Sequence, residues 1–98
     1  MTPEAKVKAK LKTYLRKHGF YWFMPVQTGY GASSLDFLTC WKGQFIGYEC
    51  KAEGRKLTPR QELVARQITA AGGQVWKVTL VNGELKYEPC GLTDSEGS

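Results

Sequence analysis

The stretch LDFLTCWKGQFIGYECK, residues 35–51, decides the fold of this chain. Its two apolar segments, residues 35–41 and 44–51, flank the dipeptide Lys42-Gly43. A glycine-containing dipeptide between two apolar runs favours a tight β-hairpin. Both faces of the predicted strands carry apolar side chains, so we expect the sheet to be covered on both sides.

The hairpin brings acidic side chains together. Counting back from the turn places Asp36 opposite Glu49, with Cβ atoms roughly 4.5–5.5 Å apart. Lys51 lies on the face of Glu49, and Cys50 points to the other face. Two like charges at this spacing need a compensating partner. Mg²⁺ fits, because it takes oxygen ligands from one or two carboxylates; the alternative is a plain ion pair of Lys51 with either acid.

The flanking sequence predicts two helices and further strands. Thr2-Pro3 and Thr58-Pro59 begin helices, since threonine caps free amides and proline is preset for the first turn. The first helix stops at Gly19 and the second continues through Ala71. The inner face of the second helix is expected to comprise Leu63, Val64, Gln67, Ile68 and Ala71. Other expected segments are a strand at 20–26, a glycine-rich loop at 27–34, and strands at 74–81 and 84–87 around Asn82-Gly83.

Length and composition narrow the class of protein. Ninety-eight residues allow one domain, which we place at residues 1–90 with a disordered tail at 91–98. Three cysteines without a CxxC pair disfavour a disulfide framework or zinc knuckle, and we expect buried free thiols. A single histidine weakens histidine-dependent catalysis. No apolar run can cross a bilayer and no secretory signal is present, so we expect a cytoplasmic protein.

The net charge of +5 suits a polyanionic partner. Basic residues crowd the first helix and the segment after Lys51, and two such clusters can follow a phosphate backbone. An ordinary solvated helix face and a charged loop are the alternative. The residues expected to contact nucleic acid are Lys6, Lys8, Lys12, Arg55, Lys56 and Arg60.

The order helix, strand, hairpin, helix, strand, with Asp36 and Glu49-Cys50-Lys51 on the hairpin, resembles the PD-(D/E)xK nuclease superfamily. The glycine-rich loop before Asp36 and the stretch LTPRQ, residues 57–61, are similar to the VRR-Nuc family, the virus-type replication-repair nucleases. Leu35 stands where that family usually has a proline. The resemblance implies a restriction-endonuclease-like αβββαβ core, an α/β fold whose mixed sheet is flanked by helices, with a C-terminal hairpin strand.

The resemblance also implies roles for individual residues. Asp36, Glu49 and the backbone carbonyl of Cys50 become metal ligands, with Glu4 a weaker addition, and Lys51 and Gln61 become catalytic. Two of these have simpler readings: Glu4 complements the dipole of the first helix, and Gln61 closes a capping box with Thr58.

The function expected from this reading is Mg²⁺- or Mn²⁺-dependent hydrolysis of DNA phosphodiester bonds. Similarity to compact phage-type VRR-Nuc proteins and to junction resolvases suggests a structure-selective endonuclease for branched DNA such as four-way junctions, acting as a homodimer inside a phage-infected or bacterial cell. One alternative is a catalytically idle nucleic-acid-binding module, and another is a hydrolase of small phosphoesters.

Overall fold

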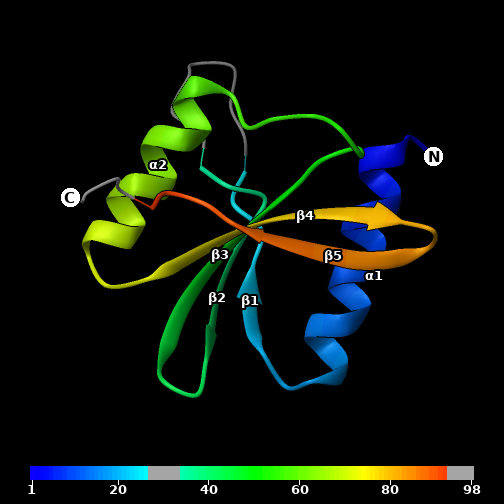
Figure 1. Ribbon diagram of the computed structural model, residues 1–98. Coiled ribbons are helices and arrows are strands. Elements are labelled where there is room, and N and C mark those ends of the chain that lie inside the picture. The colour runs from blue at the N-terminus through cyan, green and yellow to red at the C-terminus, as the bar shows by residue number, and fades with distance from the viewer. Residues whose placement is uncertain (27–33, 93–98) are drawn as a thin grey trace.

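The computed structural model describes residues 1–26 and 34–92, which form two helices and five strands. The helices lie on opposite faces of one sheet with strand order β1-β2-β3-β4-β5 (Figure 1). The elements are α1 (Pro3–Lys17), β1 (Tyr21–Phe23), β2 (Phe37–Trp41), β3 (Gln44–Cys50), α2 (Pro59–Ala70), β4 (Gln74–Val81) and β5 (Glu84–Pro89).

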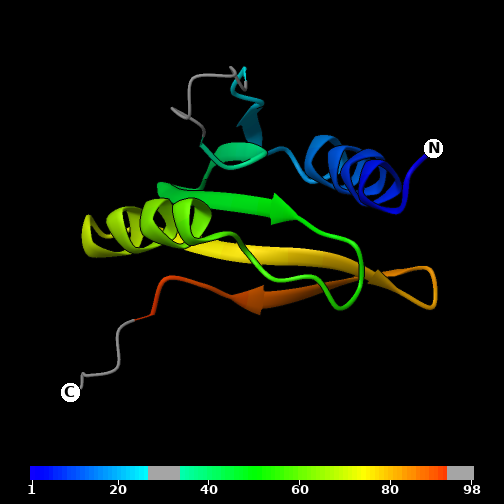
Figure 2. The ribbon, with the colours of Figure 1, turned by 90° about the horizontal axis from the view of Figure 1, so that it is seen from above.

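The sheet is mixed, as the sequence predicted. β3 and β4 are parallel, and α2 provides the connection between them (Figure 2). The other neighbouring strands are antiparallel. The α/β architecture with a C-terminal hairpin strand is therefore confirmed.

Two-residue turns fix the two predicted hairpins. Lys42 and Gly43 have φ values of 49° and 81°, and Asn82 and Gly83 have φ values of 52° and 79°. Positive φ at both central residues is the requirement of a type I′ turn, whose twist matches that of the strands. The resulting register pairs Trp41 with Gln44, as predicted.

The larger core lies between α1 and the sheet. Three residues at helical spacing, Val7, Leu11 and Leu15, are buried. They belong to the same core cluster as Ile46, Tyr48 and Cys50 of β3. Thr2 caps α1 by accepting a hydrogen bond from the amide of Ala5. A smaller core of Leu35, Ala65 and Val75 lies under α2. This packing fixes the two helices against opposite faces of the sheet.

Several local predictions were wrong. β1 ends at Phe23, because Pro25 has no N–H to continue the ladder. β2 begins only at Phe37. The sheet is not fully covered, since α2 packs mainly on β4 and leaves Phe45 45% exposed on β3. Cys40 is exposed rather than buried.

The inner face of α2 also differs from the prediction. Its fully buried residue is Ala65, whereas Leu63 is 39% exposed and Gln67 and Ala71 are exposed. Val64 and Ile68 do pack at the edge of the smaller core. Within the described ranges, no helix is both long and apolar enough to cross a membrane. Residues 27–33 of the predicted glycine-rich loop and 93–98 of the predicted tail lie outside the described residues.

Candidate active site

Three carboxylates from separate elements meet at one end of the hairpin. Glu4 comes from the first turn of α1, Asp36 directly precedes β2, and Glu49 lies near the end of β3. One carboxylate oxygen from each lies within 4.8 Å of the other two. The pairing of Phe37 with Tyr48 places Asp36 opposite Glu49 at the next position. The predicted juxtaposition of the two acids is confirmed.

Hydrogen bonds to the backbone hold Asp36 and Glu49 in place. The amide of Cys50 donates to Asp36 Oδ2 at 2.9 Å, and the amide of Asp36 donates to Glu49 Oε1 at 3.1 Å. These bonds begin where the regular strand pairing of β2 with β3 ends. Because each carboxylate is held by an amide of the opposite strand, both acids are oriented by the hairpin itself.

Gln61 links α2 to this cluster while it caps the helix. Its Oε1 accepts a hydrogen bond from the amide of Thr58, and its Nε2 donates to Glu49 Oε2; both distances are 2.9 Å. The amide of Gln61 donates in turn to the Thr58 hydroxyl, which completes the capping box. The capping role and the contact with the predicted metal ligand therefore coexist.

Two lysines face the carboxylates. Lys51 Nζ lies 3.9 Å from Glu49 Oε2, on the face that strand alternation predicted. Lys8 Nζ lies 3.4 Å from Asp36 Oδ1 and 4.0 Å from Glu4 Oε2. Lys8 was predicted only as a contact for nucleic acid, although its spacing of one helical turn from Glu4 could have indicated its place beside the acids.

Burial and crowding make the electrostatics of the cluster unusual. Glu49 is 2% exposed, and burial together with the neighbouring Asp36 raises the pKa of its carboxyl to about 8. Burial opposes the charged form of Lys8, but the Asp36 and Glu4 carboxylates together outweigh it, so the pKa of Lys8 lies above its ordinary value. Without a further cation, the protonated form of Glu49 is favoured at neutral pH.

The donor set fits a hard divalent cation. All three convergent side chains offer oxygen, the element that Mg²⁺ and Mn²⁺ prefer. When all three are ionised they exceed the charge of Lys8 and Lys51 by one. The Cys50 thiol is not part of this set: it is buried in the core under α1, and burial raises its pKa. The Cys50 carbonyl stays a predicted ligand.

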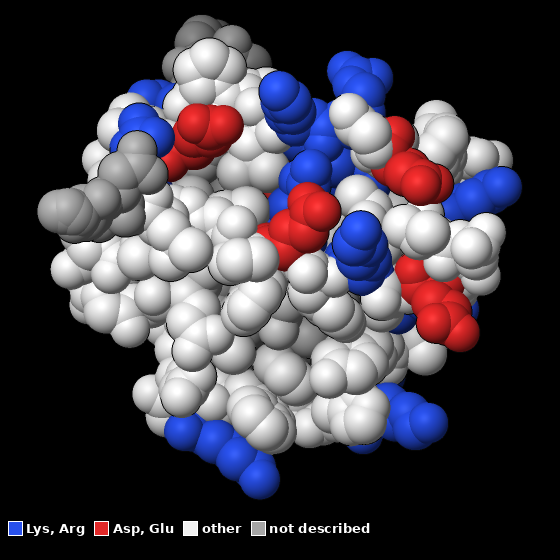
Figure 3. Space-filling view, viewed as in Figure 1, with Lys and Arg blue, Asp and Glu red and all other residues white. Residues whose placement is uncertain are grey.

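The predicted nucleic-acid contacts are spread around the site. Figure 3 shows lysine and arginine side chains gathered over the loop that follows β3 and the start of α1. Lys6, Arg55 and Arg60 are exposed, and Lys12 lies over the Trp22 ring at 5.8 Å. Lys56 is also exposed.

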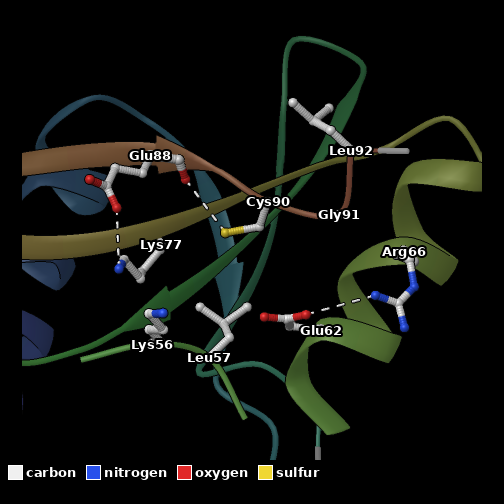
Figure 4. A pocket seen from close by; sticks show the side chains of 9 residues that line it. All are labelled: Lys56, Leu57, Glu62, Arg66, Lys77, Glu88, Cys90, Gly91 and Leu92. Atoms are coloured by element: carbon white, nitrogen blue, oxygen red, sulfur yellow. Dashed lines mark hydrogen bonds and ion pairs between the residues drawn. The ribbon is translucent and has the colours of Figure 1, made fainter. Parts of the chain in front are cut away.

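Lys56 lines a separate cavity of about 280 Å³ between α2 and β5 (Figure 4). Each acid on its wall pairs with a base: Glu62 with Arg66 at 3.8 Å, and Glu88 with Lys77 at 3.2 Å. Both acids of this cavity are therefore paired, and the bases exceed them in number, which does not favour a metal cation here.

Comparison with known proteins extends these observations. The fold is similar to that of Hjc, a Holliday junction resolvase from the archaeal hyperthermophile Archaeoglobus fulgidus, with a TM-score of 0.69 and 14% sequence identity. The similarity covers 87% of this chain and 75% of that chain. No protein-family model matches the chain, and a search of curated proteins finds no sequence match. The comparison establishes the fold, and the VRR-Nuc assignment stays a prediction.

Proposed function

We propose that this chain is a divalent-metal-dependent deoxyribonuclease of the PD-(D/E)xK superfamily that cuts branched DNA, such as four-way junctions. The observation that carries the proposal is the cluster of Glu4, Asp36 and Glu49 beside Lys51. Its occurrence on a fold shared with a Holliday junction resolvase supports the substrate class.

The residues of the cluster have different proposed roles. Glu4, Asp36 and Glu49 would hold the ion, with the Cys50 carbonyl as a further ligand. When bound, a divalent cation polarises the scissile phosphate and lowers the pKa of a water molecule. Lys51 lies beside Glu49, where its side chain would stabilise the negative charge that develops on the phosphate.

Gln61 acts as a positioning residue. Its amide fixes the Glu49 carboxylate, while its own place is fixed by the cap of α2. Groups that orient metal ligands in this way sustain both affinity and activity.

The basic residues would position DNA through its phosphates. Such contacts carry no direct sequence information. We therefore expect selectivity for the shape of the DNA rather than for its bases. The residues proposed for this role are Lys6, Lys8, Lys12, Arg55, Lys56 and Arg60.

A homodimer would let one assembly cut a branched substrate at two symmetric positions. We propose that two copies meet through an apolar face of the sheet, comprising Tyr21, Phe23, Leu38, Cys40 and Phe45. These residues line one hollow to which the described part of the chain contributes no charged side chain. Tyr21 and Phe23 are 71% and 53% exposed. Two chains of charge +5 repel one another, so an uncharged face is the favourable surface for contact.

Cleavage of labelled DNA tests the proposed function. The purified protein is incubated with four-way junction, flap, single-stranded and duplex DNA in Mg²⁺, Mn²⁺ or EDTA. We expect metal-dependent cuts in the junction, and loss of cleavage in Asp36→Asn with DNA affinity retained. Glu53→Gln, an acid in the exposed loop beyond Lys51, is the matched control.

Three outcomes would redirect the proposal. DNA binding without cleavage in any metal supports an idle binding module. Turnover of small phosphodiesters without competition from DNA supports a small-molecule hydrolase. Equal cleavage by the parent and Asp36→Asn would refute the role of the carboxylate cluster.

A further inference from the structure

A second site lies on the α1 side of the sheet. Four aromatic side chains from α1, β3, β4 and β5 line a cavity of about 270 Å³: Tyr14, Tyr48, Trp76 and Tyr87. The Tyr87 ring centroid lies 6.3 Å from that of Tyr14 and 6.2 Å from that of Tyr48. A cavity of about 150 Å³ is enough to hold benzene. The hollow beside these rings is therefore large enough for a flat molecule of one or two rings.

Tyr87, one of the lining residues, carries a polar group without a partner. Tyr87 Oη is buried, and within the described part of the chain it has no hydrogen-bond partner. Burial raises the pKa of Tyr87 to about 12, so the hydroxyl keeps its proton at neutral pH and serves as a donor. A buried hydrogen-bond donor without an acceptor lowers the stability of the fold. A ligand with flat apolar faces and a polar edge would satisfy both the rings and this hydroxyl.

The lining favours a neutral ring over a cation. Aromatic cages also bind quaternary ammonium groups through their π faces. Among residues 1–26 and 34–92, no acidic side chain lines this cavity, and the chain as a whole carries a charge of +5. A nucleobase is neutral, flat and edged with hydrogen-bonding groups, which matches the walls more closely.

The cavity lies within reach of the carboxylate cluster. Glu4 and Tyr14 are ten residues apart on α1, and a rise of 1.5 Å per residue separates them by about 15 Å. Lys6, Lys10 and Tyr14 follow one another at i, i+4 spacing and so share one edge of the helix. Lys10 Nζ donates to the carbonyl of Gly83, which places this edge beside the β4–β5 turn. Lys6 and Lys10 thus line the edge of α1 that leads to the aromatic cavity.

We propose that this cavity binds one unpaired nucleobase of the DNA strand whose phosphates follow Lys6 and Lys10. The base stacks against the tyrosine rings, and Tyr87 donates a hydrogen bond to an acceptor on its edge. At about 3.4 Å per stacked nucleotide, 15 Å corresponds to roughly four nucleotides between this base and the cut position. The inference rests on the proposed nuclease function and adds a determinant of selectivity for DNA with unpaired bases.

Binding measurements in EDTA test this site without any cleavage. The probe is a flap DNA whose unpaired arm carries the fluorescent base 2-aminopurine at each position in turn. We expect the parent protein to change the fluorescence at one position of the arm. Tyr14→Leu should weaken binding of the flap about fivefold to a hundredfold, because stacking on one aromatic ring contributes that range per base.

Tyr87→Phe gives the sharper comparison, because it removes only the unpartnered hydroxyl. We expect flap affinity to fall about threefold to tenfold, while resistance to urea is unchanged or higher. A merely structural tyrosine would leave DNA affinity unchanged. Fully duplex DNA is the matched control substrate, and both variants should bind it like the parent.

Several results would overturn the site. These are parental flap affinity in both variants, no flap binding by the parent, or displacement of the 2-aminopurine signal by tetramethylammonium. Failure of the proposed function has a different signature, namely flap binding with the expected variant effects but no cleavage in Mg²⁺ or Mn²⁺.

Discussion

Replacing Glu49 with glutamine should remove a pH-dependent loss of stability from the metal-free protein. Burial and the nearby Asp36 raise the pKa of Glu49 from 4.5 to about 8. Below pH 4.5 the folded and unfolded chains both hold this proton, whereas between pH 4.5 and 8 only the folded chain does. The free energy of unfolding therefore falls as the pH rises through this window. At about 1.4 kcal/mol per pH unit, the loss has an upper bound of roughly 5 kcal/mol.

Urea unfolding in EDTA at pH 5, 6, 7 and 8 measures this effect. The parent and the control Glu53→Gln should lose stability across the series. Glu49→Gln should lack this contribution and be the most stable of the three at pH 8. Mg²⁺ should restore stability at pH 8 to the parent but not to Glu49→Gln, because the cation takes the place of the proton. A parent stability that is flat or rising from pH 5 to 8, or the same slope in Glu49→Gln, would refute this reasoning.

Three further predictions concern the supports of the site and the apolar face. Gln61→Ala should lower junction cleavage about tenfold to a hundredfold. Thr58→Ala removes only the cap of α2, so it should lower the free energy of unfolding by about 0.5–2 kcal/mol in thermal unfolding and retain cleavage. Equal cleavage by both variants would contradict the positioning role of Gln61. Gly47→Ala should destabilise the fold by about 1–3 kcal/mol in urea, because its Cβ would lie 2.7 Å from a side-chain carbon of the buried Leu35; unchanged stability would show that this contact relaxes freely. Phe45→Asp should convert a dimer to a monomer by light scattering with unchanged circular dichroism, and a monomeric parent would refute the apolar face as the dimer contact.

The hairpin and its acids could be predicted because local rules determine them. The type I′ turn at Lys42-Gly43 fixes the register, and strand alternation then fixes which side chains share a face. The opposition of Asp36 and Glu49 follows from counting alone. The capping box of Thr58 and Gln61 could be predicted in the same way. The hydrogen bond from the Gln61 side chain to Glu49 could not, because it depends on how α2 packs on the sheet.

The inner face of α2 was mispredicted because hydrophobicity alone does not decide burial. α2 approaches its neighbours so closely that a Cβ at Gly91 would lie 2.5 Å from the carbonyl oxygen of Ala65. The small Ala65 is therefore buried, while the larger Leu63 points outward. Close helix packing selects small residues at the contact, which a search for large apolar side chains overlooks.

The aromatic cavity was also beyond the reach of sequence patterns. Tyr14, Tyr48, Trp76 and Tyr87 come from four elements and share no motif. Tyr48 belongs to the buried core, and Trp76 and Tyr87 pack at its edge, which are ordinary places for aromatic residues. Only the tertiary arrangement brings their rings around one space and, within residues 1–26 and 34–92, leaves the Tyr87 hydroxyl without a partner.

A Mn²⁺ titration that follows bound ion by electron paramagnetic resonance, and junction cleavage in the same samples, tests the central claim most directly. We predict that the cleavage rate rises in proportion to Mn²⁺ bound at the carboxylates, and that Asp36→Asn lowers occupancy and rate together. Undiminished binding of Mn²⁺ by Asp36→Asn, or cleavage that proceeds without bound ion, would contradict the assignment of this cluster as the metal-dependent active site.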